Sequence, residues 1–217
     1  MQEMIKKRFD AIIANLDQLP GIPDVVSKVI NMVNDPNVDF RKVAEEISKD
    51  QSITASILKL CNSAYFSKGK EIASLDRAIV TLGIKEVKDI VVVVTCRQVL
   101  DKPILGYDIA AGEMWIHNLA VAIMAKKIAV DGKFRHISDV VFTGGIIHDV
   151  GKTVLALYVA NAFKEIMRVT QENGIPFTEA ETSVMGYSHQ DIGARILDKW
   201  KFPESLKSIV KYHHDPE

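Results

Sequence analysis

A histidine and an aspartate stand side by side in residues 144–152, which read GGIIHDVGK. The residues before the pair are small or aliphatic, so the stretch favours a helix that carries His148 and Asp149 toward the interior. Burying two such polar groups costs free energy unless each has a partner. Because imidazole and carboxylate are both common metal ligands, the doublet predicts a metal ion as that partner.

Five of the six histidines fall where they could join this site, and only His136 is left over. Glu113 and His117 are four residues apart, so on one helix they share a face and could bind the same ion. Nitrogen and oxygen ligands without a thiolate suit one or two divalent ions of Fe, Mn, Zn, Co or Ni. The candidate metal ligands are Glu113, His117, His148, Asp149, His189, His213 and His214.

Several candidates also have a purely structural interpretation. Glu113 and His117 could lie on a solvated helix face, and His213 and His214 could be exposed near the last residues of the sequence. Such interpretations must be invoked separately at each position. The set taken together therefore favours a metal site.

Helix caps offer a structural interpretation for two further residues. His189 could simply follow a Ser188 cap at the start of a helix. Glu181 fits a capping box that starts at Thr178, in which the glutamate reaches back to the Thr178 amide. On this interpretation Glu181 takes no part in the site.

Helical spacing of apolar residues, interrupted by proline, glycine and asparagine, continues along the whole chain. We find no alternating strand pattern, so the predicted fold class is all-α. Residues 101–106 make the only plausible boundary, between an N-terminal lobe of about 1–105 and a second lobe of about 106–217. The expected helices are 5–16, 24–33, 39–47, 50–61, 74–83, 84–100, 109–130, 138–150, 153–173, 178–187, 189–200 and 204–214.

Charge and composition limit the function classes. The 27 basic and 28 acidic residues leave a net charge of −1, so no positive field marks a surface for nucleic acid or an anionic membrane. No segment approaches the ~20 apolar residues that a bilayer span needs, and the valine run at 91–94 has charges close to it on both sides. Cys61 and Cys96 sit in apolar surroundings without a CxxC pattern, which predicts buried thiols and a cytoplasmic protein.

Two sets of motifs resemble a known family. The order of His117, then His148-Asp149, then Gly151-Lys152 is similar to the HD superfamily of metal-dependent phosphohydrolases. From about residue 19 to residue 214 the chain resembles the HDOD domain, the HD-related output domain of bacterial signalling proteins. The segments that carry this resemblance are LPGIP at 19–23, DQSIT at 50–54, LKLCNSAYF at 58–66, SLDRAI at 74–79 and LG at 82–83.

The resemblance implies one HDOD domain over residues 1–217, with an N-terminal helical lobe packed against an HD-like lobe. The candidate ligands and Lys152 fall on positions that resemble the ligands and catalytic lysine of the HD-GYP cyclic dinucleotide phosphodiesterases. In an active enzyme Lys152 would neutralise phosphate charge and Asp149 would hold the metal.

Two departures from the family pattern limit what the resemblance implies. The last aspartate ligand and the Gly-Tyr-Pro loop of those phosphodiesterases follow the position of His214, where this sequence has only residues 215–217. Gln51 stands where the HDOD pattern has proline after Asp50, which we expect to change only the start of a helix.

Two functions follow from these observations. The leading hypothesis is a cytoplasmic signal-transduction domain that binds metal and acts through signalling proteins or a phosphate-containing small ligand. The alternative is an active dinuclear-metal phosphohydrolase that acts on a cyclic dinucleotide or another phosphoester. A helix-turn-helix over residues 74–94 would expose its valine-rich second helix and offers few basic residues, so we expect no nucleic-acid partner and no membrane association.

Overall fold

The computed structural model describes residues 24–35, 37–63, 71–159 and 162–215. Within these ranges the regular elements are helices, apart from one isolated bridge between Ile104 and Ile109, so the all-α prediction is confirmed. The helices are α2 (Asp24–Asn34), α3 (Phe40–Ser48), α4 (Gln51–Cys61), α5 (Leu75–Leu82), α6 (Ile84–Leu100), η1 (Leu105–Tyr107), α7 (Glu113–Asp131), η2 (Arg135–Ile137), α8 (Ser138–Ile147), α9 (Val150–Val159), α10 (Phe163–Asn173), α11 (Phe177–Met185), α12 (His189–Lys199) and α13 (Glu204–Tyr212).

Most helix boundaries agree with the sequence predictions, but two predicted helices were wrong. The helix expected over 138–150 ends at Ile147, and a turn at His148 and Asp149 separates it from α9. The helix expected over 153–173 is divided between α9 and α10, which pack on different partners, α12 and α11 respectively. No proline or glycine marks either break, so packing rather than local sequence decides them. The helix expected over 5–16 lies outside the described residues.

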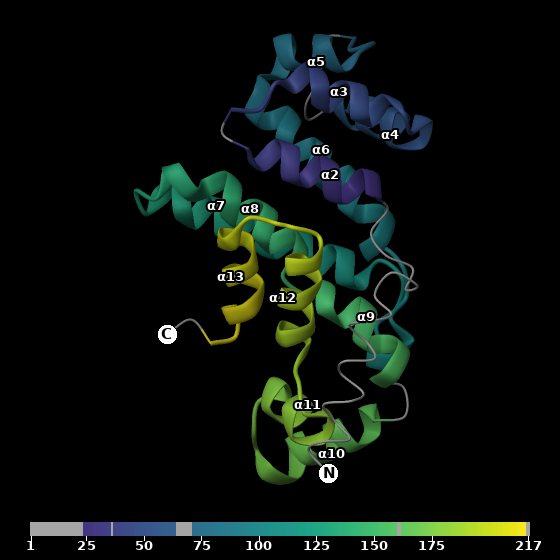
Figure 1. Cartoon of the computed structure of the whole chain (residues 1–217), viewed down its shortest axis with the longest axis vertical. Helices are drawn as coiled ribbons and strands as arrows, with labels where there is room; N and C mark the ends of the chain where they lie inside the picture. The colour runs from purple at the N-terminus through teal and green to yellow at the C-terminus, as the bar shows by residue number, and fades with distance from the viewer. Residues whose placement is uncertain (1–23, 36, 64–70, 160–161, 216–217) are drawn as a thin grey trace.

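The helices are arranged along one long axis (Figure 1). Helices α3, α4 and α5 lie at one end, α10 and α11 lie at the other, and α7, α8, α9, α12 and α13 lie between them. Helix α6 joins the two parts of the chain because it packs on α2, α4 and α5 and also on α7 and α8. None of the described helices is long and apolar enough to cross a membrane.

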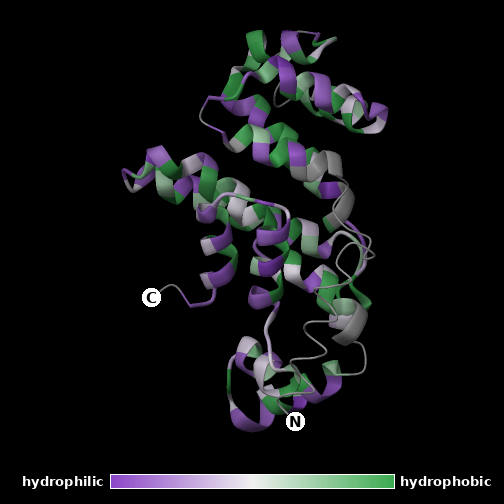
Figure 2. Cartoon of the chain, viewed as in Figure 1, coloured by the Kyte–Doolittle hydropathy of each residue, from purple (hydrophilic) through white to green (hydrophobic). Residues whose placement is uncertain are grey.

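Burial follows the amphipathic pattern of the helices. The visible side of α13 is largely hydrophilic in Figure 2, whereas its buried residues are Leu206 and Val210. In α6, Val91 and Val92 are buried, as expected for a valine run that belongs to the core. Cys61 and Cys96 are free and buried, which confirms the prediction of buried thiols.

An asparagine in the N-terminal motif has a structural role. The Asn62 side chain accepts a hydrogen bond from the Ile72 amide (2.8 Å) and donates to the Ile72 carbonyl (2.7 Å). It also donates to the Leu58 carbonyl at the end of α4 (2.9 Å). Asn62 therefore ties the end of α4 to the chain that leads into α5, far from the histidine cluster.

Candidate metal centre

Close packing of helices around the doublet builds the site. His148 and Asp149 occupy the turn between α8 and α9, and two glycines allow other helices to approach this turn. A Cβ at Gly145 would lie 2.6 Å from the Cα of Ala122 in α7, and a Cβ at Gly151 would lie 1.9 Å from the carbonyl oxygen of His189 in α12. Only glycine permits contacts this close, so these two positions bring α7 and α12 against the doublet.

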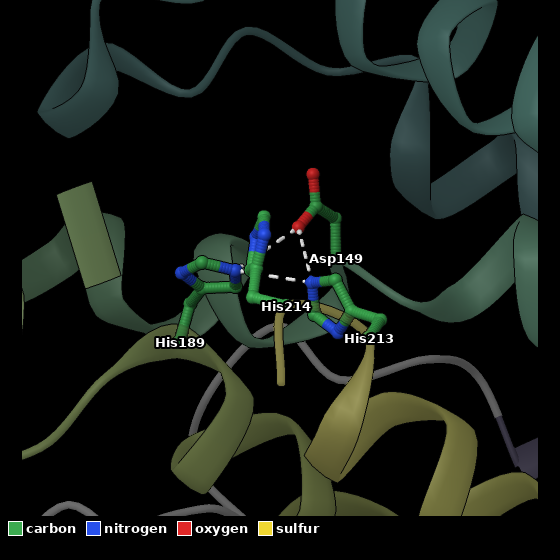
Figure 3. A group of neighbouring side chains, drawn as sticks. All are labelled: Asp149, His189, His213 and His214. Carbon is green, nitrogen blue, oxygen red and sulfur yellow. Dashed lines mark hydrogen bonds and ion pairs between the residues drawn. The ribbon is translucent and has the colours of Figure 1, made fainter. Parts of the chain in front are cut away.

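Five of the other six candidate ligands gather around Asp149. Potential ligand atoms of Asp149, His189, His213 and His214 all lie within 4.8 Å of one another (Figure 3). A second group with the same spacing contains His117, His148 and Asp149. Asp149 is common to both groups, so its carboxylate lies between two sets of imidazoles.

The two carboxylate oxygens of Asp149 face different histidines. Oδ1 lies 3.3 Å from the Nε2 of His189 and 3.6 Å from the Nε2 of His213. Oδ2 lies 3.6 Å from the Nε2 of His148 and 3.9 Å from the Nε2 of His117. This is the arrangement expected of a carboxylate that can serve two cation positions, one at each oxygen.

Lys152 already forms an ion pair with one of these oxygens. Its ammonium lies 2.5 Å from Oδ2 of Asp149 and is mostly buried. A cation at the His117 and His148 group would have to share Oδ2 with this ammonium. The Oδ1 side, with His189 and His213, has no such competitor among the described residues.

In three histidines a hydrogen bond at Nδ1 fixes which ring nitrogen carries the hydrogen. Nδ1 of His148 lies 2.8 Å from the Gly145 carbonyl oxygen, and Nδ1 of His213 lies 2.9 Å from the Val210 carbonyl oxygen. A carbonyl oxygen can only accept, so each Nδ1 carries the hydrogen and each neutral ring has a lone pair on Nε2. In His189 the acceptor of Nδ1 is a carboxylate oxygen, at 2.7 Å. All three Nε2 atoms therefore point toward Asp149 in the form that binds metal.

A cation fits this centre because three atoms in it lack a compensating charge or hydrogen. Oδ1 of Asp149 is buried and has no hydrogen-bond partner among the described residues. The Nε2 atoms of His189 and His213 are 3.3 Å apart, and in the tautomers described above neither carries a hydrogen. Facing lone pairs repel each other and a buried carboxylate oxygen without a partner is costly. A divalent ion bound by these three atoms would relieve both costs.

Burial sets the charge states in the group. It lowers the pKa of His148 to about 4 against the attraction of Asp149, and it lowers the pKa of His214 to about 4 together with the repulsion of His213. Burial alone would raise the pKa of the Asp149 carboxyl, but His213 and Lys152 beside it hold that pKa well below its usual range. At neutral pH Asp149 is ionised while His148 and His214 are neutral, which are the forms that bind metal.

We expect the metal-free protein to lose stability as the pH falls from about 6.5 to about 4. In this window an unfolded histidine takes up a proton, whereas folded His148 stays neutral, so the free energy of unfolding falls with the pH. The contribution of His148 is fully present above the unfolded pKa and amounts to roughly 3 kcal/mol at 1.36 kcal/mol per pKa unit. Urea unfolding in the presence of a chelator across this range measures the loss.

The matched variants for this pH test are His148→Gln and His136→Gln. The first removes the buried imidazole and should reduce the pH dependence to the part that His214 contributes in the same window. The second changes an exposed histidine of η2 and should leave the pH dependence of stability as in the wild type. Equal slopes for His148→Gln and the wild type would contradict the assignment.

Glu113 is not brought into either group. Its Oε2 accepts a hydrogen bond from the amide of Ala110 (2.8 Å), so this oxygen is held by the backbone just before α7. His136 is exposed in η2, as expected for the histidine left over. Ser188 does cap α12 through a capping box with Asp191, so His189 is both the first residue of a capped helix and a member of the group.

The capping box predicted for Glu181 was wrong. Pro176, not Thr178, is the residue before α11, and no side chain caps that helix. Glu181 is fully buried instead, with Oε2 against His189 and Oε1 accepting a hydrogen bond from the Tyr107 hydroxyl (2.6 Å). The spacing of Phe177, Ala180 and Glu181 places the glutamate on the inward face of α11, which is a signal that the sequence contained.

A pocket of about 960 Å³ opens beside the centre. Lys152, His189 and His214 form one end of it, and the other end is apolar, with Phe163 and Phe177. Hydroxyl and amide groups also line the pocket, as do the carboxylates of Glu179 and Asp215; the hydroxyl and amide groups belong to Thr178, Thr182, Ser183, Ser188 and Gln190. The pocket thus joins the histidine cluster and Lys152 to an aromatic wall, and nothing local in the sequence indicated the wall.

Comparison with known proteins places the chain in a family. Over 216 residues it is 22% identical to an uncharacterised protein of Treponema pallidum, covering 99% of this chain but only 41% of that protein. A crystal structure of an HDOD domain protein of unknown function from Geobacter sulfurreducens superposes with a TM-score of 0.75 at 26% identity, covering 98% of this chain and 69% of that one.

A second solved structure, from Shewanella amazonensis, is named as a proposed phosphohydrolase. It superposes with a TM-score of 0.73 at 23% identity, covering 95% of this chain and 72% of that one, which shows a shared fold. The sequence profile of the HDOD domain matches residues 19–216. A match over this much of the sequence, together with the all-helical fold around the His148-Asp149 turn, shows that the chain belongs to the HDOD domain family.

Proposed function

We propose that this HDOD domain is a metal-binding regulatory domain whose metal centre recognises a phosphate-containing small ligand. The observation that carries the proposal is the buried, unpaired Oδ1 of Asp149 facing the Nε2 atoms of His189 and His213. Three histidines each form a hydrogen bond at Nδ1 and direct Nε2 at the same carboxylate, and histidines with a purely structural role in a core do not require this arrangement. Metal sites do, because the second hydrogen bond orients each ligand.

The residues that would hold a first ion are Asp149, through Oδ1, with His189, His213 and His214. This position has no ammonium competing for its carboxylate oxygen. His117 and His148 would hold a second ion more weakly, since Lys152 already pairs with Oδ2. Nitrogen and oxygen donors of this kind suit Fe, Mn, Zn, Co or Ni.

Lys152 is the group of the pocket that would bind an anion. Its ammonium lines the pocket next to the histidine cluster, where a phosphate oxygen could contact both the lysine and a bound ion. The apolar wall at Phe163 and Phe177 would then take the organic part of the ligand. Regulation would follow if binding of the ligand changed the affinity of this domain for partner proteins, as expected of a signalling output domain.

Metal analysis of the purified protein tests the proposal first, followed by titration of the metal-loaded protein with inorganic phosphate. Bound metal, and phosphate binding that disappears on chelation, would support it. A protein without metal after incubation with Mn or Fe, and with thermal stability unchanged by a chelator, would contradict it because a ligand that binds the folded state must stabilise it.

We expect Lys152→Met to weaken phosphate binding by roughly 10-fold or more, since hydrogen bonds to charged groups contribute about 1.5–3 kcal/mol. Isothermal titration of metal-loaded wild type and variant with phosphate measures the change. Lys207→Met is the matched control, because Lys207 pairs with Asp198 and Glu204 on the surface of α13 and does not line the pocket. Equal phosphate affinities for the two variants would contradict the proposed role of Lys152 in phosphate binding.

Hydrolysis is the second candidate function. The observation in its favour is that the two oxygens of Asp149 face separate histidine groups, as in a carboxylate that bridges two ions. Bound ions would supply Lewis acidity and activated water. In this reaction Lys152 would bind the phosphoryl oxygens, and Asp149 would orient the centre. Turnover of a cyclic dinucleotide or a generic phosphodiester with added Mn or Fe supports the enzyme; phosphate binding without turnover supports the regulatory domain alone.

A further inference from the structure

Glu181 makes three hydrogen bonds in the interior, all to groups at the edge of the metal centre. Its Oε2 accepts from the backbone amide of His189 (3.0 Å) and lies 2.7 Å from Nδ1 of the same residue. Its Oε1 accepts from the hydroxyl of Tyr107 (2.6 Å), which is 74 residues away in the sequence. The side chains of Glu181 and His189 are 0% and 1% exposed, so water does not replace these bonds.

An ionised carboxylate can only accept hydrogen bonds, so it holds the hydrogen of His189 on Nδ1. The lone pair is then on Nε2, which lies 3.3 Å from Oδ1 of Asp149. Without Glu181 the ring could exchange its hydrogen to Nε2 and donate to Asp149, and Nε2 could no longer bind an ion. The carboxylate therefore selects the tautomer that a metal ion needs.

His189 differs from the other two oriented histidines in this respect. The Nδ1 atoms of His148 and His213 meet neutral backbone carbonyls, at 2.8 and 2.9 Å. The Nδ1 atom of His189 meets a carboxylate, and a charged acceptor makes a stronger bond and a more basic ring. Among these three imidazoles, His189 would be the strongest donor to a cation.

We infer that Glu181 is a positioning residue of the metal centre and that Tyr107 positions Glu181 in turn. This inference rests on the proposed metal binding, because its effect is exerted through His189. Neither residue touches the ion position itself. The Tyr107 hydroxyl holds Oε1, which leaves Oε2 directed at the amide and the ring of His189.

Tyr107 also connects the centre to two other parts of the molecule. It belongs to η1 in the segment between α6 and α7, so it comes from the junction of the two lobes. Its ring contacts Phe163 and Phe177, with centroids 6.4 and 6.0 Å away, and both line the pocket. A ligand against this aromatic wall would therefore press on the residue that orients Glu181.

The first test uses the metal-free protein and the nitrogen NMR signals of its imidazoles. The wild type should show His189 protonated on Nδ1 and unprotonated on Nε2, assigned by loss of these signals in His189→Gln. Glu181→Leu, which has no acceptor, should lose this preference. Where that variant does not fold, Glu181→Gln replaces it, because an amide oxygen is a weaker acceptor and should give a mixture of tautomers.

The second test measures binding of Co²⁺ alone, by chelator competition and by the visible spectrum of the bound ion. We expect Glu181→Leu to weaken binding by about 10- to 100-fold, and Glu181→Gln and Tyr107→Phe by less, as is usual for outer residues of a metal site. The ligand-field bands of Co²⁺ should shift in the Glu181 variants. Glu172→Gln, an exposed glutamate of α10, should change neither the affinity nor the spectrum.

The two tests separate failure of the inference from failure of metal binding. If wild type binds no Co²⁺, the proposed function fails, yet the NMR result still decides whether Glu181 selects the tautomer of His189. If wild type binds Co²⁺ while the Glu181 variants keep its affinity, its spectrum and the Nδ1 tautomer, the inference is overturned. A purely structural role for Glu181 would lower the melting temperature without shifting the Co²⁺ bands.

Discussion

Asp149→Ala should reduce the bound metal to background, a loss of at least ~100-fold in affinity when the shared ligand of a site is removed. The carboxylate is the one residue common to both histidine groups, and its two oxygens face different members of them. Without it, the remaining members of the two groups are histidines, and none of them offers a negative charge to offset that of a divalent ion. Metal content after dialysis against Mn, Fe or Zn measures the effect.

The control for this experiment is Asp198→Ala. Asp198 is an exposed carboxylate of α12 that pairs with Lys207, and its removal should leave the metal content unchanged. Circular dichroism of both variants shows whether the helices persist. If Asp149→Ala is folded and retains the metal of the wild type, the site is not built around Asp149 and our assignment of its ligands is wrong.

Gly151→Ala should destabilise the protein by about 3 kcal/mol or more, at the upper end of the costs of overpacking. The added Cβ would lie 1.9 Å from the His189 carbonyl oxygen and 2.8 Å from the Gly193 amide nitrogen. Both are backbone atoms of α12, so α9 and α12 would have to separate. Since Asp149 precedes α9 and His189 starts α12, the same movement should also weaken metal binding.

Gly174→Ala is the matched comparison for Gly151→Ala. Gly174 has φ of +63° and open space where a Cβ would lie, so alanine there should cost only about 1 kcal/mol of backbone strain. Urea unfolding of both variants gives the two free energies. A cost for Gly151→Ala no larger than that for Gly174→Ala would show that α9 and α12 are not in close contact at this position.

The local sequence was sufficient to predict helix starts and helical segments that depend only on neighbouring residues. Helix α12 begins where Ser188 and Asp191 form a capping box, and α6 follows the apolar spacing and the glycine at 83. No proline or glycine stands at residues 148–149 or between the end of α9 at Val159 and the start of α10 at Phe163, and the sequence therefore predicted continuous helices at both places. Packing of α8, α9 and α10 against different partners divides them.

The sequence by itself determined the all-α class, the order of most helices and the residue types available to bind a metal. Each of these depends on periodicity or on neighbouring residues, which a linear pattern contains. Seven candidates were expected in one site, of which the structure brings six together, and their role as metal ligands stays a prediction.

Only the tertiary structure decided how those residues are oriented. It assigned Oδ1 and Oδ2 of Asp149 to different histidines, placed Glu113 outside both groups, and moved Glu181 from a supposed cap to the ring of His189. The physical reason is that helix packing brings together residues far apart in the chain, such as Tyr107 and Glu181. The hydrogen bond between them cannot be predicted from the residues that neighbour either one in the sequence.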